Sequence, residues 1–197
     1  MEECNFEELN KALKEGEVIG FATDNVWGIG VLPSSEKGVD KVYEIKNRDR
    51  SKPLILMSND INNLLPYVEN MPPKAKKIAD KFFPGAVTLV LKKSKLTKDY
   101  ITNSMDTVGI RVPKHKGFMN LCEKIDGHVL ATTSANISNQ KTSVCKKDVE
   151  TSIGKDLYKI YGEDTSCEGV ASTVVLVDNN NNVKILRQGS ANLEDCI

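Results

Sequence analysis

The sequence predicts an α/β protein with a mixed sheet that is flanked by helices. Short apolar runs alternate with amphipathic stretches along the chain, and the last two apolar runs flank the polar residues 178–182. Alternating strands and helices are typical of α/β sheets, and asparagine tolerates the left-handed conformations of a hairpin turn. We therefore expect helices between most strands and an antiparallel hairpin near the end of the chain.

The first predicted elements are two helices and two strands. Asn5 begins a capping-box pattern that opens a short helix, and Gly16 ends it. Residues 18–22 then form a strand. Ser35 is the expected cap of a second amphipathic helix, and residues 53–57 are apolar enough to form a buried strand behind it.

The middle of the chain continues this alternation. Asp60 starts a further short helix, and the proline pair at residues 72–73 opens a lysine-rich helix that runs to Phe83. The Pro-Gly pair at residues 84–85 breaks this helix. Residues 87–91, which are rich in β-branched and aliphatic side chains, form the next strand.

The last predicted elements complete the sheet. Residues 108–112 and 129–132 form strands on either side of a helix that covers about residues 117–125. Residues 172–177 and 183–186 are the two strands of the closing hairpin.

Composition indicates one globular domain over residues 1–197 and excludes several functional classes. The chain has 27 basic and 27 acidic side chains and 40% hydrophobic residues. Zero net charge disfavours a strongly nucleic-acid-binding or membrane-surface protein, because polyanions are bound through excess Lys and Arg. No apolar run approaches the ~20 residues that span a membrane, and the acidic N-terminus does not resemble a signal peptide. We expect a cytoplasmic protein.

The cysteines and histidines do not have the spacing of a metal site. The five cysteines are Cys4, Cys122, Cys145, Cys167 and Cys196. They include no CxxC pair, and His115 and His128 are in no HxxxH or HxH pattern. We expect reduced thiols, histidines at the surface or in loops, and no metal ligands from the protein.

Common catalytic motifs are missing as well. The sequence has no GxxxxGK[ST] phosphate loop and no GxSxG nucleophile elbow, and Gly28 and Gly30 are not followed by the third glycine of a dinucleotide site. Any chemistry would therefore depend on positioning and charge rather than on a nucleophilic side chain.

Two polar segments have both a structural and a functional interpretation. Residues 23–30, TDNVWGIG, either form a capped turn or line a pocket for a small zwitterion. Residues 46–53, KNRDRSKP, place four cations within seven residues. Such a cluster either complements a helix C-terminus in solvent or clamps a polyphosphate through the planar fork of Arg and the mobile charge of Lys.

Arg111 lies in the apolar strand 108–112 and requires an anionic partner, because burial of an unpaired charge is costly. That partner is either a carboxylate or phosphate of a ligand or an acidic residue of the protein. Nearby in the pattern, residues 130–138 carry hydroxyls and an amide, and a second arginine ends the strand before Gly189.

Taken in order, these segments resemble the YrdC-like threonylcarbamoyl-AMP synthase family. The family patterns TDTVYGLG, K-x-R-x(3)-KPL, FPG-x-x-T, V-x-x-R-x-P, SAN-x-S, ST-V-V and I-x-R-x-G have counterparts at residues 23–30, 46–54, 83–88, 108–113, 133–138, 172–175 and 185–189. Each pattern is short, but seven in fixed order between about residues 17 and 190 are specific. The resemblance implies a single-domain protein whose twisted sheet lines a concave, basic cavity.

The resemblance also implies a reaction. This family joins L-threonine, bicarbonate or CO2, and ATP into threonylcarbamoyl-AMP and releases diphosphate, with magnesium on the leaving group. The enzyme class would be nucleotidyltransferase. A downstream tRNA threonylcarbamoyltransferase would then modify tRNA, and no membrane would be involved. Both direct and indirect contact of this chain with tRNA stay open from the sequence.

Site residues are transferred from the family by motif position. ATP would be held by Arg48, Lys52, Thr107, Ser134, Asn136, Thr142 and Arg187. Threonine would be held by Asn25, Arg111, Thr132 and Ser172. Lys46, Arg48 and Lys52 would stabilise the charge of the reacting phosphates, and no side chain is assigned as a general base.

Several residues depart from the family pattern. Asn25 replaces the usual Thr, Ala22 replaces Pro, and Trp27 replaces Tyr. Asn139 and Gln140 replace the glycine that commonly follows the SAN-x-S segment, and Met57 lies near a position where some members have a polar threonine contact. Asn25 and Met57 therefore bear on the threonine side of the predicted site rather than on the nucleotide side.

Three alternatives remain open from the sequence. The first is a YciO-like relative with altered or lost synthase activity. The second is a non-catalytic RNA-binding module that uses Lys74, Lys76, Lys77 and Lys81. The third is a carbamoyltransferase domain of the kind found within larger hydrogenase-maturation proteins.

Overall fold

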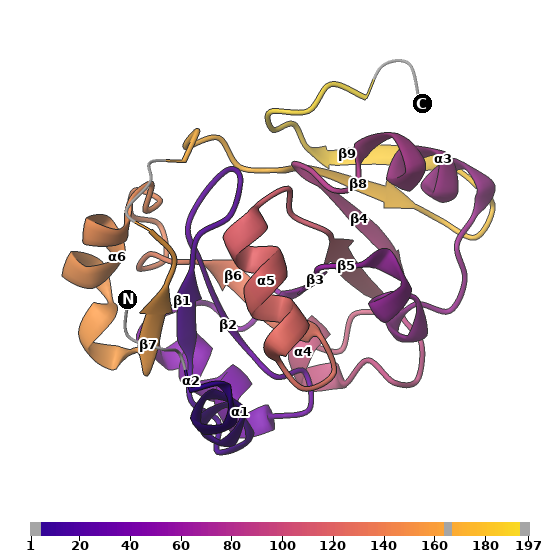
Figure 1. Ribbon diagram of the computed structural model, residues 1–197. Coiled ribbons are helices and arrows are strands. Elements are labelled where there is room, and N and C mark those ends of the chain that lie inside the picture. Colours follow the sequence, from indigo (N-terminus) through magenta and orange to yellow (C-terminus); the bar gives the residue numbers. More distant parts are fainter. Residues whose placement is uncertain (1–4, 164–166, 194–197) are drawn as a thin grey trace.

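The computed structural model describes residues 5–163 and 167–193, and within these ranges nine strands form one sheet (Figure 1). The strands are β1 (Ile19–Phe21), β2 (Gly28–Val31), β3 (Ile55–Ser58), β4 (Val87–Lys92), β5 (Thr107–Arg111), β6 (Val129–Ser134), β7 (Lys159–Tyr161), β8 (Thr173–Val177) and β9 (Val183–Arg187). Their order is β7-β1-β2-β6-β3-β5-β4-β8-β9. The predicted mixed sheet is confirmed, because three of the pairs are parallel and five are antiparallel.

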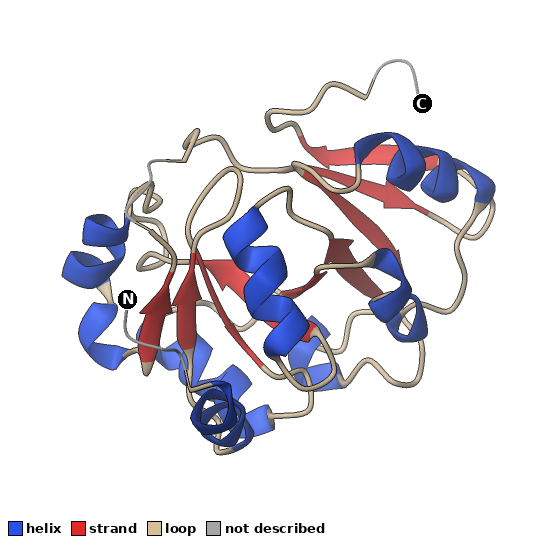
Figure 2. Ribbon diagram, in the orientation of Figure 1, coloured by secondary structure: helices blue, strands red, loops and turns tan. Residues whose placement is uncertain are grey.

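Six α-helices and three 3₁₀ turns surround the sheet in the described part of the chain, as Figure 2 shows. The helices are α1 (Phe6–Lys14), α2 (Glu36–Ile45), α3 (Pro73–Phe82), α4 (Asp99–Thr102), α5 (Lys116–Lys124) and α6 (Lys146–Ser152). The 3₁₀ turns are η1 (Ile61–Asn63), η2 (Leu65–Tyr67) and η3 (Gly154–Asp156). Each predicted helix therefore has a counterpart, although the one expected after Asp60 consists of two 3₁₀ turns.

Side-chain caps fix three helix starts. Asn5 Oδ1 accepts from the backbone N–H groups of Glu7 and Glu8 before α1, and Ser35 Oγ accepts from that of Gly38 in α2. His115 was expected at the surface or in a loop. It is partly buried and caps α5, since its Nδ1 accepts from the Phe118 N–H at 3.1 Å.

The closing hairpin is confirmed. Val175 of β8 pairs with Ile185 of β9 in antiparallel register. In the connecting turn, the Asp178 carboxylate accepts from the backbone N–H groups of Asn180 and Asn182, and Asn181 has a left-handed φ of 65°. Local Asp and Asn hydrogen bonds thus form the turn that the composition predicts.

Period-two alternation separates the two faces of the central strands. Val87, Leu89 and Leu91 of β4 belong to the larger apolar core, as do Val108 and Ile110 of β5. The intervening side chains point to the opposite face. A smaller core packs α1 and α5 onto the sheet through Leu9, Leu13, Phe118 and Leu121, and Figure 1 shows α5 crossing in front of the sheet.

Two strands and two α-helices, together with the 3₁₀ turn η3, were not predicted. β2 lies within the segment that was treated as a polar loop, where its glycines hide the strand pattern. β7 has three residues, α4 has four, and α6 buries only Val149. Such short or polar elements carry little apolar periodicity and are stabilised by their neighbours.

The expectations about membrane helices and cysteines can be compared only with the described residues. No helix of the described residues is long and apolar enough to cross a membrane. Cys122, Cys145 and Cys167 are free thiols, while Cys4 and Cys196 lie outside the described ranges.

Candidate functional site

A cavity of about 300 Å³ lies over the centre of the sheet on the face opposite the larger core. Its walls come from β2, β3, β4, β5, β6, β8 and β9 and from four loop segments. They comprise Thr23, Asn25, Val26, Gly28, Arg48, Pro53, Ile55, Met57, Thr88, Arg111, Thr132, Thr133, Ser134, Thr142, Ala171, Ser172, Val174 and Arg187. In β3, strand alternation places Ile55 and Met57 in the cavity, and at the end of β6 three consecutive residues, Thr132, Thr133 and Ser134, line it.

Gly109 leaves space beside Ile55 and Thr88, two residues that line the cavity. It is paired with Ile55 in the sheet, and a Cβ at this position would lie 2.7 Å from Cγ2 of Ile55 and 3.2 Å from Cγ2 of Thr88. A larger residue would push these two side chains into the cavity. Met57, which was left out of the predicted site because of its apolar character, forms part of the same wall.

Arg111 has an anionic partner within the protein. Its guanidinium is 2% exposed and donates to Asp24 Oδ1 at 2.6 Å and to the Gly85 carbonyl at 2.9 Å. The internal salt bridge that the sequence left open is thus present. Burial lowers the pKa of Arg111, and the Asp24 carboxylate acts in the opposite direction.

Asn25 joins this ion pair to the cavity. Its Oδ1 accepts from Arg111 Nη1 at 2.9 Å and from the Val26 backbone N–H at 2.9 Å. The side chain is almost fully buried, and among the described residues its Nδ2 has no hydrogen-bond partner. The loop itself is fixed by Gly169 N–H and Cys167 Sγ, which donate to the carbonyls of Asn25 and Thr23.

Lys46 is buried in a different environment. It is 1% exposed, and its Nζ donates to the carbonyls of Ser134 and Asn136, each at 2.5 Å. No ion pair of Lys46 with a carboxylate is found among the described residues. Burial, with a smaller effect of the nearby Arg48 charge, lowers the pKa of Lys46 to about 7.

The segment after β6 is held mainly by its own polar groups. Asn136 Nδ2 donates to the carbonyls of Ile137 and Gln140, and its Oδ1 accepts from Ser134 Oγ at 2.6 Å. Asn139, which replaces the common family glycine, has a left-handed φ of 66° that asparagine tolerates. The substitution therefore preserves the turn.

The remaining cations differ in exposure. Arg48 lines the cavity and donates to the carbonyls of Lys52 and Pro53, both at 3.1 Å. Lys52 is exposed, and its Nζ lies 3.4 Å from Asn139 Oδ1. Burial lowers the pKa of Arg48.

The opposite wall is a linked set of hydroxyls and a guanidinium. Thr88 Oγ1 and Ser172 Oγ are 2.9 Å apart, and Arg187 Nη2 donates to the Ser172 carbonyl at 2.9 Å. Gly189 allows the chain to return beside Ser172, because a Cβ there would lie 2.2 Å from the Ala171 carbonyl oxygen.

Most of the predicted site residues meet at this cavity. Its walls include Asn25, Arg48, Arg111, Thr132, Ser134, Thr142, Ser172 and Arg187. Lys46 and Asn136 lie behind the wall and Lys52 at its outside, whereas Thr107 pairs with Lys92 at the end of β5 away from Arg111. The predicted site did not include Ile55, Met57 or Thr88, although Thr88 ends the FPG-x-x-T motif and Met57 lies near a position where some family members have a threonine contact. Strand alternation places all three on the cavity face.

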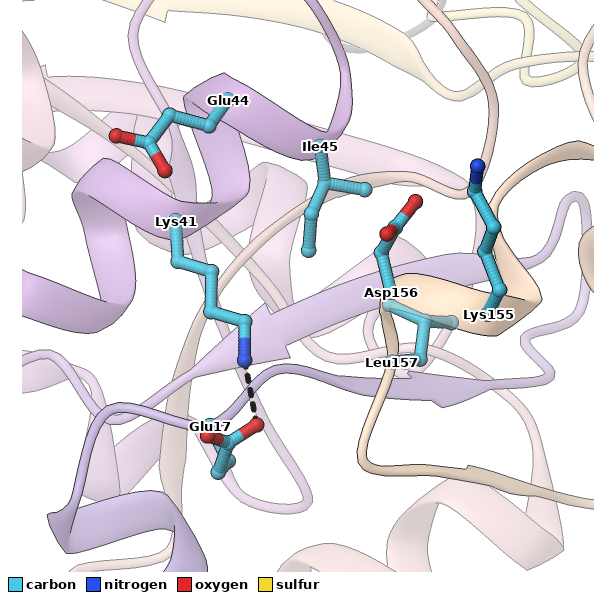
Figure 3. Close-up of a pocket in the computed structure, with 7 residues that line it drawn as sticks. All are labelled: Glu17, Lys41, Glu44, Ile45, Lys155, Asp156 and Leu157. Atoms are coloured by element: carbon cyan, nitrogen blue, oxygen red, sulfur yellow. Dashed lines mark hydrogen bonds and ion pairs between the residues drawn. The ribbon is translucent and has the colours of Figure 1, made fainter.

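A second, more open hollow of about 570 Å³ lies elsewhere, between α2 and η3 (Figure 3). Its charged groups already balance one another in part, since Lys41 pairs with Glu17 at 2.5 Å. None of the predicted site residues lines it. The smaller cavity is therefore the candidate site.

Residues 11–189 match the Sua5_yciO_yrdC family, which carries the description telomere recombination. The chain belongs to this family. Among curated relatives, a threonylcarbamoyl-AMP synthase of Vibrio campbellii is 30% identical over 94% of this chain and 99% of its own length. The synthase of Pyrococcus abyssi is 34% identical over 83% of this chain and 48% of its own length.

Solved structures of the Sua5/YciO/YrdC family have the same fold. P. abyssi Sua5 complexed with L-threonine superposes with a TM-score of 0.89 at 30% identity, covering 99% of this chain and 57% of that protein. Escherichia coli YciO has a TM-score of 0.83 at 19% identity, covering 98% of this chain and 92% of that protein. The second likeness concerns the fold alone.

Proposed function

We propose that this chain is a threonylcarbamoyl-AMP synthase that forms threonylcarbamoyl-AMP and diphosphate from L-threonine, bicarbonate or CO2, and ATP. The observation that carries this proposal is the single cavity in which Arg111 and Asn25 from one side meet Arg48, Ser134 and Arg187 from others. The named relatives and the L-threonine complex of P. abyssi Sua5 support it.

The amino-acid substrate is assigned to the wall near Arg111. Asn25, Arg111, Thr132 and Ser172 would contact threonine, and Met57 and Ile55 would provide apolar surface for its methyl group. Arg111 uses three of its N–H directions on Gly85, Asn25 and Asp24. A guanidinium carries five N–H groups, so two remain for a ligand.

The nucleotide is assigned to the wall around Arg48. Arg48, Ser134, Thr142 and Arg187 line the cavity and would contact ATP directly. Lys46 and Asn136 would act by holding the Ser134 segment and by adding positive charge. Lys52 would reach the phosphates from the exposed side, and the role of Thr107 stays a prediction.

The chemistry proposed for this site is adenylyl transfer by alignment. The carbamate formed from threonine and CO2 already carries a negative oxygen, which attacks the α-phosphorus of ATP. The new O–P bond forms as the bond to the bridging oxygen breaks, and that oxygen leaves with diphosphate. Arg48 and the other cations stabilise the phosphate charge, so no general base is required for this step. This reaction would make the enzyme a nucleotidyltransferase.

Magnesium would arrive with ATP rather than bind to the protein. Among the described residues, no group of three or more His, Cys, Asp or Glu side chains could hold a metal ion. Asp24, which neighbours the cavity-lining Asn25, is engaged with Arg111 at 2.6 Å. Since Mg²⁺ at nucleotide sites is held largely by phosphate oxygens and water, the ion is treated as part of the MgATP substrate.

The product is proposed to pass to a tRNA threonylcarbamoyltransferase. A mixed anhydride of a carbamate and AMP is labile, so that a cytoplasmic partner acting on tRNA would have to consume it rapidly. Direct contact of this chain with tRNA is not required by the chemistry.

The test is direct detection of the product. Purified protein is incubated with ATP, magnesium, bicarbonate and labelled L-threonine, and diphosphate and labelled threonylcarbamoyl-AMP are measured. Both products should form at equal rates and only with all substrates present. Tight ATP binding without either product would overturn the proposal and favour the YciO-like alternative.

A further inference from the structure

Cys145 and Cys167 are brought together by the fold although they are far apart in the chain. The Cys167 backbone N–H donates to the carbonyl of Val144, the residue before Cys145, at 2.7 Å. Gly169 packs on the same residue, because a Cβ at this position would lie 3.2 Å from Cγ1 of Val144. Residues 143–145 and 167–169 are therefore two adjacent segments.

This hydrogen bond places the two cysteines within reach of a disulfide. Standard peptide geometry puts the Cα atom of Cys145 about 2.8 Å and that of Cys167 about 3.6 Å from the Val144 carbonyl oxygen. The two Cα atoms therefore lie within about 6.4 Å of each other, and disulfides join Cα atoms that are about 4.4–6.8 Å apart. The sulfur atoms also interact: burial raises the pKa of the Cys167 thiol, and the nearby Asp24 and Cys145 act in the same direction.

Oxidation of the pair would change one hydrogen bond and keep another. Both side chains are free thiols that are partly exposed. Cys167 Sγ donates to the Thr23 carbonyl at 3.1 Å, and Cys145 Sγ accepts from the Asp148 N–H at the start of α6. A disulfide sulfur has lone pairs but no hydrogen. The bond from Asp148 can therefore remain, whereas the bond to Thr23 is lost.

The two cysteine segments support residues 23–27, the loop beside the cavity. The Gly169 N–H donates to the Asn25 carbonyl at 2.9 Å, and the Trp27 N–H donates to the Ser143 carbonyl at 3.1 Å. Thr23, Asn25 and Val26 line the cavity. A change at the cysteine pair therefore reaches a wall of the candidate site.

We propose that Cys145 and Cys167 form a reversible disulfide under oxidising conditions, and that its formation destabilises the loop at residues 23–26. The thiolate of one cysteine attacks oxidised glutathione, which forms a mixed disulfide and releases one glutathione thiolate. The thiolate of the other cysteine then attacks the protein sulfur of the mixed disulfide, so that the Cys145–Cys167 bond forms as the bond to glutathione breaks. Two protein thiols are oxidised, one glutathione disulfide is reduced, and the two thiol protons pass to the two released glutathione thiolates. This inference does not depend on the proposed function.

Peptide mapping by mass spectrometry tests the disulfide. Wild-type protein is incubated with oxidised glutathione at pH 8.5, because the raised pKa of Cys167 leaves little thiolate at lower pH. The digest should contain peptides joined through Cys145 and Cys167, and dithiothreitol should separate them. Cys122 should stay reduced, because burial raises its pKa to about 11. Glutathione on Cys145 or Cys167 without a link between them, or a link of either to Cys4 or Cys196 in its place, would overturn the proposal.

Hydrogen exchange tests the effect on the loop. The Val26 N–H donates to Asn25 Oδ1 at 2.9 Å. Its exchange should become about 2- to 10-fold faster in the oxidised protein, as expected when a neighbouring hydrogen bond is lost. Cys167→Ser is the control, since its hydroxyl can donate to the Thr23 carbonyl but cannot form the disulfide. This variant should exchange like the reduced wild-type protein, with or without oxidised glutathione. Unchanged Val26 exchange in linked wild-type protein would overturn the effect on the loop.

Discussion

Two cations are buried at the site in opposite ways. Arg111 is 2% exposed and has a carboxylate partner in Asp24 at 2.6 Å, whereas Lys46 is 1% exposed and, within the described part of the chain, has carbonyl and amide oxygens as its acceptors. The field of Asp24 opposes the effect of burial at Arg111, but no anion does so at Lys46. The charge of Arg111 is therefore balanced within the protein, whereas the charge of Lys46 is one that an anionic ligand would stabilise.

This difference agrees with the proposed division of the site. An amino acid is a zwitterion and brings little net charge to the Arg111 side. ATP carries several negative charges, which would raise the pKa of Lys46 and favour its protonated form. Substitutions at Asp24, Lys46, Arg48 and Arg111 test the two sides of the site separately.

The largest effect is expected from Asp24→Ala, which leaves the Arg111 charge buried without its partner. The free energy of unfolding should fall by about 3–5 kcal/mol, as for other broken buried ion pairs. Urea unfolding measures this change. Asp126→Ala is the control, because its pair with Lys14 is more than half exposed on both sides and should contribute less than about 1 kcal/mol. Equal losses of unfolding free energy in both variants would show that Asp24 does not stabilise the buried Arg111 charge.

Lys46 should make the protein more stable as the pH rises, because burial disfavours its charged form. Its folded-state pKa of about 7 lies below the ordinary value of 10.5, so that the unfolded chain binds more protons between these values. The penalty is complete below pH 7 and is lost as the pH rises toward 10.5. Relative to Lys46→Met, the wild-type protein should gain roughly 3 kcal/mol between pH 7 and pH 10. If the stability difference between the two proteins does not vary with pH, then the folded-state pKa of Lys46 is not lowered.

Arg48→Ala should weaken ATP binding about 10- to 100-fold, because it removes a charge-assisted contact of about 1.5–3 kcal/mol from the cavity wall. Calorimetric titration with ATP measures the loss. Arg50→Ala is the control, since Arg50 pairs with Asp40 and does not line the cavity. Lys52→Ala should lie between the two because Lys52 is exposed. If both Arg48→Ala and Lys52→Ala bind ATP with wild-type affinity, then residues 46–53 are a solvated charge cluster and do not clamp the phosphates.

The smallest effect is expected from Arg111→Lys, which keeps the charge beside Asp24 but loses the planar fork. The KM for threonine should rise about tenfold, from the loss of one to two hydrogen bonds, while the KM for ATP changes little. Steady-state kinetics with each substrate varied in turn distinguishes the cases. Equal increases for both substrates would assign Arg111 a purely structural role.

The sequence by itself determined the fold class, the order of the main elements and the family. Asn5 and Ser35 predicted the starts of their helices, and the Asp-Asn segment predicted the hairpin turn. Caps and turns can be predicted in this way because they depend on hydrogen bonds within a few residues. Most residues that line the cavity also lie within the matched motifs, including Asn25, Arg111 and Arg187.

The tertiary structure decided which of several possible partners each polar residue has. Asp24 lies 87 positions before Arg111 and the Ser134 carbonyl lies 88 positions after Lys46, and no local pattern relates such positions. Only the sheet order brings β3, β5 and β6 together so that Met57 and Thr132 share a wall. Burial and pairing depend on how the whole chain packs. Arg111 and Lys46 are both cations in the sequence, but in the fold Arg111 is paired with a carboxylate and Lys46 is bound by carbonyl and amide oxygens.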